Sequence, residues 1–346
     1  MRIWRSYMNN RNNMTIHFEI TADIINDEFL SFIAKMPVNM FQFEIGVQST
    51  HEPTLQQIQR RNDWGKISKY VTQIMSYKNI HLHLDLIVGL PFETYELFGR
   101  SFNDVYELQP HMLQIGFLKL LRGSGIRQDA AKYGYLFMDT APYEVLGNQY
   151  LDYSQIYQLK IFEELFNQLY NSGRFLHFLP FLIHITGKDA FSFYETLTQY
   201  WIRKQLHTVA HSTKSMYKHL AEFCKEYCPS EEKHCLEMLK LNSLLSEKGS
   251  IRPEFLPWNE MEWAEDKNRF WRNEALVRKY IPKYTFTNWR EIKKQYHLEV
   301  FSTNVVKEYF SKNDCKFIPI LFSYAEREVS YHHIDPADFF AMEDSE

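Results

Sequence analysis

Cysteine is scarce in this sequence, and it is missing from the whole first part of the chain. The 346 residues contain four cysteines, the first of which is Cys224. So few thiols cannot build the dense disulfide framework of a small secreted protein. We therefore expect a cytoplasmic protein whose cysteines are reduced.

Three other features are absent or weak. There is no run of 18 apolar residues and no signal-peptide pattern, so no membrane contact is expected. The formal net charge of -4 gives no overall basic field, and no nucleic-acid partner is expected. By contrast, 45% hydrophobic and 16% aromatic content predicts well-filled cores, and the length allows two domains.

Three short segments alternate polar and apolar residues, at 17–20, 41–49 and 81–91. Successive strand residues point to opposite faces, so each segment predicts a strand with one polar face. That face collects His17, Glu19, Gln42, Glu44, Gln48, His81, His83 and Asp85. Helix-like stretches between the segments indicate a parallel sheet, which is usually apolar on both faces. A polar second face is better explained as a barrel-like wall around a polar site.

The remaining pattern predicts an α/β domain followed by a mainly helical one. A fourth strand is expected over 112–120, and residues 1–135 are predicted to form the first domain. The second domain, residues 136–346, is predicted to be mainly α with a small terminal β-sheet. Helices are expected at 1–12, 22–36, 54–60, 64–77, 94–108, 143–170, 189–207, 213–226, 230–247 and 260–280, and terminal strands at 299–306 and 317–324.

Two motifs carry a family resemblance. Phe43-Glu44-Ile45-Gly46-Val47-Gln48-Ser49 and Leu84-Asp85-Leu86-Ile87-Val88-Gly89-Leu90-Pro91 resemble the later barrel strands of radical S-adenosylmethionine (radical SAM) enzymes, most closely the cobalamin-binding group. His17-Phe18-Glu19-Ile20 with Ala22-Asp23 resembles the preceding strand, and residues 114–120 the following one. Residues from about 140 onward resemble an uncharacterised domain that follows some of these modules. The resemblance implies an incomplete (β/α) radical-SAM-type partial barrel.

The resemblance also implies roles for four residues in binding S-adenosylmethionine. Glu19 would accept hydrogen bonds from the ribose and amino-acid part, and the strand of Glu44 and Gln48 would lie under the nucleoside. Asp85 would lie near the adenine. Carboxylates are suitable acceptors for ribose hydroxyls and an ammonium group, and Gly46 permits close backbone approach.

One departure from the family pattern decides what the chain is expected to do alone. The family holds a 4Fe-4S cluster through a Cys-x3-Cys-x2-Cys loop near the start of the barrel, and this loop is absent here. The cobalamin-binding domain is absent too. We expect a truncated or split chain that is inactive alone, while the intact parent binds S-adenosylmethionine, a 4Fe-4S cluster and cobalamin. A separate polypeptide carrying the cluster-binding half would dock on the edge strand that bears Glu19.

Two alternatives stay open. In the first alternative, the chain is a non-catalytic module that binds nucleosides or other proteins. In the second, it is an enzyme unrelated to the radical SAM family. In the latter, Glu19, Glu44 and Asp85 would perform acid–base chemistry.

Two groups have metal-like spacing, but packing explains both more simply. His81 and His83 share a strand face. Cys224, Cys228, His234 and Cys235 fit neither a zinc pattern nor the family's cluster loop. No metal ligands are predicted.

Overall fold

The computed structural model divides into two compact units. It describes residues 15–21, 25–60, 63–246, 250–259, 261–282, 295–302, 316–326 and 329–340, and the single residues 285, 292, 305 and 309. The expected helix over residues 1–12 and the Ala22-Asp23 pair lie outside these. Unit 1 comprises Met1–Asn171 and Lys188–Gln199, and unit 2 comprises Ser172–Gly187 and Tyr200–Glu346. The expected boundary near residue 135 stays a prediction, because compactness alone does not establish a folding unit.

Unit 1 is built on a parallel sheet of four strands, as the alternating segments predicted. The strands are β1 (Ile16–Ile20), β2 (Phe41–Gln48), β3 (Ile80–Val88) and β4 (Met112–Phe117), in the order β1-β2-β3-β4. The expected fourth strand extended to Leu120, but β4 ends at Phe117, and the Leu118 N–H makes the last hydrogen bond to β3, to the Val88 carbonyl at 3.0 Å. Lys119 instead forms an antiparallel bridge with Glu144, and the Leu120 N–H donates to the Tyr143 carbonyl at 2.9 Å.

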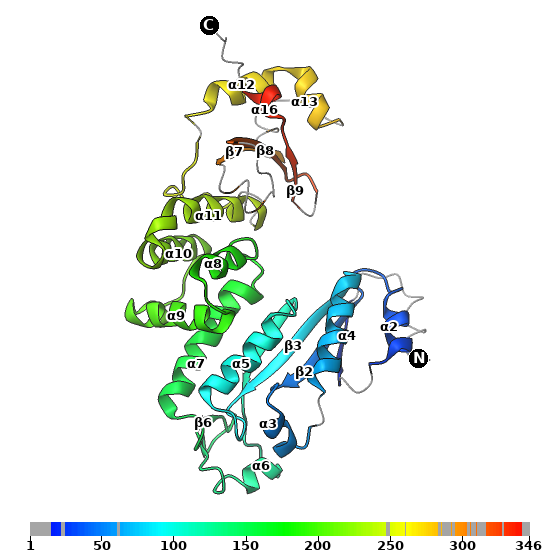
Figure 1. Ribbon diagram of the computed structural model, residues 1–346, viewed down its shortest axis with the longest axis vertical. Coiled ribbons are helices and arrows are strands. Elements are labelled where there is room, and N and C mark those ends of the chain that lie inside the picture. Colours follow the sequence, from blue (N-terminus) through cyan, green and yellow to red (C-terminus); the bar gives the residue numbers. More distant parts are fainter. Residues whose placement is uncertain are drawn as a thin grey trace. The chain divides into compact units, whose positions relative to one another are not determined.

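Helices cover the apolar face of this sheet. They are α2 (Asp27–Ile33), α4 (Trp64–Tyr77) and α5 (Tyr95–Tyr106), and α4 and α5 lie along β3 (Figure 1). Each begins at a capping side chain, Asn26, Asp63 or Thr94, that accepts a backbone N–H of the first turn. Every second residue of β2 is buried, while the residues between are only partly buried. The sheet therefore has one apolar, covered face and one polar face.

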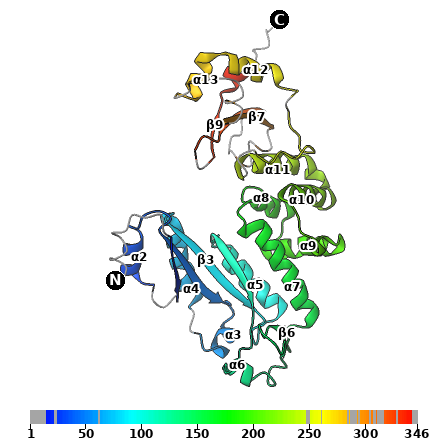
Figure 2. The ribbon, with the colours of Figure 1, turned by 180° about the vertical axis from the view of Figure 1, so that it is seen from behind.

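The rest of unit 1 wraps around the carboxyl ends of the strands and around α5. These elements are α3 (Glu52–Gln57), α6 (Gly125–Gln128), β5 (Leu136–Phe137), β6 (Val145–Gly147), α7 (Tyr153–Phe166), the π-helical turn η2 (Asn167–Asn171) and the first part of α9 (Ala190–Arg203). Helices α3 and α6 lie near the same end of the sheet in both views (Figure 1, Figure 2). Phe102 of α5 packs against Phe162 and Phe166, each with ring centroids 5.2 Å away. This aromatic core fixes α5 against α7.

The two edges of the sheet differ. At β4, the Asn171 side chain accepts the Leu113 N–H at 3.0 Å and donates to the Leu113 carbonyl at 2.9 Å. Its amide thereby takes the hydrogen-bonding position that a further strand would use. At the other end of the order, β1 is the last strand within the described part of the chain.

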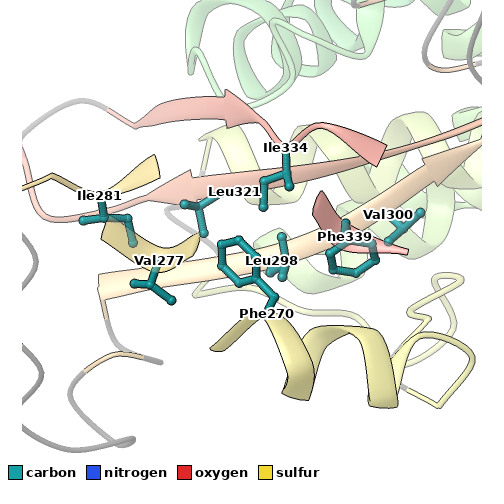
Figure 3. Packing of buried hydrophobic residues seen from close by; sticks show 8 residues of the cluster. All are labelled: Phe270, Val277, Ile281, Leu298, Val300, Leu321, Ile334 and Phe339. Carbon is teal, nitrogen blue, oxygen red and sulfur yellow. The ribbon is translucent and has the colours of Figure 1, made fainter. Parts of the chain in front are cut away.

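Unit 2 is mainly helical with a small antiparallel sheet, as predicted. It contains α8 (Leu179–Thr186), η3 (Leu206–Thr208), α10 (Thr213–Tyr227), η4 (Pro229–Glu231), α11 (Glu232–Ser246), α12 (Ala264–Arg272), α13 (Glu274–Tyr280), β7 (Tyr296–Ser302), β8 (Phe317–Ser323), β9 (Ser330–His333) and α16 (Pro336–Phe339). The sheet order is β7-β8-β9. Phe270, Leu298 and Phe339 form part of its apolar core (Figure 3). None of the described helices is both long and apolar enough to cross a membrane.

Gly99 tests the aromatic core of unit 1. A Cβ at this position on α5 would lie 2.7 Å from Cδ1 of the buried Phe191. Overpacking costs about 1–3 kcal/mol, and the better helix propensity of alanine returns about 1 kcal/mol. We expect Gly99→Ala to lower the free energy of unfolding by roughly 1 kcal/mol in urea denaturation. Gly125→Ala is the control, because nothing lies within 4 Å of its Cβ position. Equal stability of the two variants would contradict this packing.

Candidate functional site

The polar face of the parallel sheet brings three carboxylates together. Strand register places Glu19 of β1 beside Glu44 of β2, and Gly46 of β2 beside Asp85 of β3. Glu44 and Asp85 share a hydrogen bond, and the charge of Glu19 also acts on Asp85. We call Glu19, Glu44 and Asp85 the carboxylate row.

Burial and like charges shift the protonation of Asp85. Its partial burial raises its pKa most, and Glu44 and Glu19 raise it further, to about 7. Asp85 Oδ1 is buried and has no hydrogen-bond partner within the described residues. A buried acceptor without a partner is costly, and such atoms often face a ligand or an ordered water. Asp85 is therefore the strongest single indication of a binding site on this face.

Histidines lie next to the carboxylate row: His83 is the register partner of Glu44, and His17 and His81 lie two residues nearer the amino ends of their strands. His17 Nε2 lies 2.8 Å from Glu44 Oε2, and His81 Nδ1 lies 3.0 Å from His83 Nε2. Burial lowers the pKa of His81, His83 and His111, and the neighbouring His81 lowers the pKa of His83 and His111 further. The Leu82 N–H donates to His111 Nδ1 at 3.1 Å, which fits a neutral ring. These three imidazoles do not supply the positive charge that the carboxylate row lacks.

Gln48 lies at the carboxyl end of β2. Its backbone has a positive φ of 69°, and the register with β3 shifts between Gly46 and Gln48. The Gln48 amide folds over Gly46, where a Cβ would meet Gln48 Nε2. The Gln48 side chain thus occupies the space above Gly46 on the polar face.

A cleft of about 410 Å³ opens at the carboxyl ends of the strands. Its lining comes from the ends of β2, β3 and β4 and from α3 and α6, and includes Gln48, Arg60, Ile87, Leu90, Leu118 and Asp129. The carboxyl ends of parallel strands are where α/β folds usually bind ligands. Gln48 lines this cleft, and its side chain covers Gly46, which is the register partner of Asp85. The four residues predicted from the sequence to bind S-adenosylmethionine therefore lie along one polar face: Glu19, Glu44, Gln48 and Asp85. Their roles in binding stay predictions.

Sequence reasoning missed a buried carboxyl that holds the rim of this cleft. Ser49 Oγ and Ser101 Oγ donate to Glu93 Oε1 at 2.5 and 3.0 Å, and Glu93 is fully buried. Burial raises the pKa of Glu93 to about 7, despite the lowering effect of both hydroxyls. Glu93 thus connects the loop after β2 to α5. The available signal was its position two residues after Pro91, which ends the segment that resembles a barrel strand of the family.

The residues present do not fit a 4Fe-4S cluster. Cysteine is absent before Cys224, and the three described cysteines, Cys224, Cys228 and Cys235, are buried in unit 2. A hydrogen bond with Cys235 and burial raise the pKa of Cys224, and burial raises that of Cys228 to about 11. Protonated thiols are poor metal ligands. Over the described ranges, no group of three His, Cys, Asp or Glu side chains is placed to hold a metal ion.

Glu93 makes the stability of unit 1 depend on pH. Its folded-state pKa of about 7 exceeds the ordinary value of 4.5, so its contribution is fully present below pH 4.5 and is lost as pH rises through 7. The pKa difference corresponds to about 3 kcal/mol. We expect Glu93→Gln to flatten the decrease in the free energy of unfolding between pH 4.5 and 8, measured by urea denaturation.

Asp85 contributes a second decrease over the same range, so the Glu93 effect is the difference between wild type and variant. Glu107→Gln, an exposed carboxylate at the end of α5, is the control and keeps the wild-type slope. Parallel pH profiles for wild type and Glu93→Gln would show that Glu93 ionises like an exposed acid.

Several solved structures match the chain, and two of them, both radical SAM enzymes, have 20% and 14% sequence identity to it. Coproporphyrinogen III oxidase (HemN) from Escherichia coli, a radical SAM enzyme, is 20% identical with a TM-score of 0.33, covering 48% of this chain and 36% of that one. The radical S-adenosylmethionine methyltransferase TsrM from Kitasatospora setae, with cobalamin and a 4Fe-4S cluster bound, is 14% identical with a TM-score of 0.32, covering 44% and 31%. The chain thus spans about a third of the length of these structures.

A family model matches a larger part of the sequence. No curated protein matches the chain. The model described as "Protein of unknown function (DUF4080)" matches residues 131–322, which is more than half of the chain and includes most of the segment predicted to form an uncharacterised domain. The chain therefore belongs to the DUF4080 family.

Proposed function

We propose that unit 1 is the S-adenosylmethionine-holding part of a radical SAM site whose cluster ligands lie outside the residues described here. The carboxylate row carries this proposal, because it crowds three carboxylates and places the orphaned Asp85 Oδ1 on a sheet face that leads to a cleft. S-adenosylmethionine carries a sulfonium and an ammonium cation. A cationic ligand with ribose hydroxyls would offset both the charge and the missing hydrogen bond.

Each residue of the site has a chemical role in this proposal. Glu19 and Glu44 would accept hydrogen bonds from ribose hydroxyls or the ammonium group, and Asp85 would be held ionised by the ligand's positive charge. The Gln48 amide, which folds over Gly46, would contact the nucleoside from the cleft. The role of Glu93 is positioning, since it holds the Gln48-Ser49 strand end without facing the cleft.

Radical chemistry also needs a 4Fe-4S cluster, for which the described residues provide no ligands. We therefore assign binding and orientation of S-adenosylmethionine to this chain, and cluster ligation to another polypeptide. The exposed side chains of His17 and Glu19 on β1, the last described strand, support this edge as the docking surface. The capped β4 edge supports the same choice. The sequence resemblance extends the proposal to a parent enzyme that binds cobalamin.

Proton release on binding tests the proposal. With a pKa of about 7, Asp85 is about half protonated at pH 7, and a cationic ligand lowers this pKa. We expect titration calorimetry with S-adenosylmethionine, in buffers of different ionisation enthalpy, to record release of up to about half a proton at pH 7. Asp85→Asn abolishes the release, and Glu44→Gln weakens binding at least about tenfold.

Glu107→Gln, which lies outside the site, keeps both the wild-type affinity and the proton release. Binding with no buffer dependence would remove Asp85 from the site. Absence of binding by a folded protein would contradict the proposal as a whole.

A further inference from the structure

A cationic side chain lines the cleft at the carboxyl ends of the strands in unit 1. It belongs to Arg60, which directly follows the last turn of α3. The Arg60 N–H donates to the Leu55 carbonyl at 2.8 Å, and the Gln59 N–H donates to the Gln56 carbonyl at 3.1 Å. Gln59 has a positive φ of 58°, so these two bonds form the Schellman ending of a helix. The helix end therefore fixes the backbone that carries Arg60.

Asp129 brings the opposite charge to the same cleft. It ends α6, where its N–H donates to the Gly125 carbonyl at 3.0 Å. Within the described part of the chain, the side chains of Arg60 and Asp129 form no hydrogen bond or ion pair, with each other or with another residue. The exposed Lys132 feels the charge of Asp129 without pairing with it. The cleft thus has one cation and one carboxylate that the fold itself does not use.

Aliphatic side chains make up much of the remaining lining. Leu90 is buried, whereas four others are only partly buried, namely Ile58, Ile87, Leu118 and Ile126. Ile87 lies two residues beyond Asp85 on β3, so it is on the same face of the sheet, about 7 Å further along the strand. An apolar group held by these side chains would therefore lie next to a ligand on the carboxylate row.

We propose that the cleft binds a free amino acid with a large apolar side chain, as the second substrate of the unit 1 site. Arg60 pairs with its carboxylate, Asp129 pairs with its ammonium group, and the aliphatic lining covers its side chain. A zwitterion matches both charges, whereas a simple anion or cation leaves one without a partner. The cleft volume of about 410 Å³ is that of a small-molecule site, roughly 300–1,000 Å³. The role as second substrate rests on the proposed function, but binding of the amino acid does not.

Titration calorimetry of the full chain, without S-adenosylmethionine, tests this site with four probes. L-phenylalanine has both charged ends and an apolar body, and glycine has the charged ends alone. Phenylpropanoate lacks the ammonium group, and phenylethylamine lacks the carboxylate. We expect L-phenylalanine to bind at millimolar concentrations or below, with glycine weaker. Loss of either charged end is expected to weaken binding about fivefold, the upper end for ion pairs near a protein surface.

Two variants assign each end of the ligand to one residue. Arg60→Gln removes the partner of the carboxylate, so it is expected to bind L-phenylalanine and phenylethylamine equally. Asp129→Asn removes the partner of the ammonium group, so it is expected to bind L-phenylalanine and phenylpropanoate equally. Lys69→Gln on α4 and Glu107→Gln at the end of α5 make the same charge changes outside the cleft and keep the wild-type preferences.

Three results would overturn the proposal. These are no binding of L-phenylalanine by the folded wild type, unchanged preferences in either cleft variant, and loss of binding at saturating S-adenosylmethionine. The last result would show that S-adenosylmethionine fills the cleft itself. Thermal unfolding shows that each variant is folded, and either variant alone keeps the test valid. Proton release by Asp85 is measured separately, so failure of the amino acid to bind is distinguishable from failure of the proposed function.

Discussion

Like-charge crowding on one face of the parallel sheet is the constraint on which the account of unit 1 depends. Packing of α2, α4 and α5 on the other face fixes the strand register. The register pairs Glu19 with Glu44 and places Asp85 two residues beyond the β3 position opposite Glu44, beside Gly46. Burial raises the pKa of Asp85 most and the neighbouring carboxylates of Glu44 and Glu19 raise it further, so Asp85 holds its proton to a higher pH. The neighbouring histidines are neutral or already paired and do not remove this repulsion. The fold therefore keeps an electrostatic cost that a cationic ligand would relieve.

Buried polar groups in the two units serve different purposes. Glu93 and Asp85 have raised pKa values, because burial or like charge disfavours their ionised forms. Glu299 has a lowered pKa, because His297 and two lysines more than compensate for its burial. An ionised carboxyl surrounded by cations is a stable anchor, whereas a carboxyl with a pKa near 7 changes its charge readily when a ligand or a proton arrives. Unit 1 thus contains groups whose charge a ligand can change, and unit 2 contains a buried carboxylate that stays ionised.

Much of unit 1 could be predicted from the sequence, because strict alternation of polar and apolar residues determines both strand and face. Three of the four strands and the polar face of β2 and β3 followed from that pattern, and the helix-like stretches between the segments indicated the parallel direction. Glu93 could not be found in this way, because its role depends on Ser49 and Ser101, which are brought together only by the fold. The buried ion pair between Lys240 and Glu299 in unit 2, at 3.1 Å, was missed for the same reason: the two residues are far apart in sequence, and β7 read as an ordinary apolar strand. The third strand of unit 2, Ser330–His333, has too little apolar character to be predicted.

Hydrogen–deuterium exchange of the chain with and without S-adenosylmethionine tests the central claim, that the polar face of unit 1 holds this cationic nucleoside. A ligand bound on this face slows hydrogen exchange of the backbone amides near it and leaves the exchange of distant amides unchanged. The account predicts slower exchange in β2 around Gly46 and Gln48 and in β3 around Asp85, with no change in β7–β9. Unchanged exchange in unit 1 at saturating ligand, or protection confined to unit 2, would contradict it.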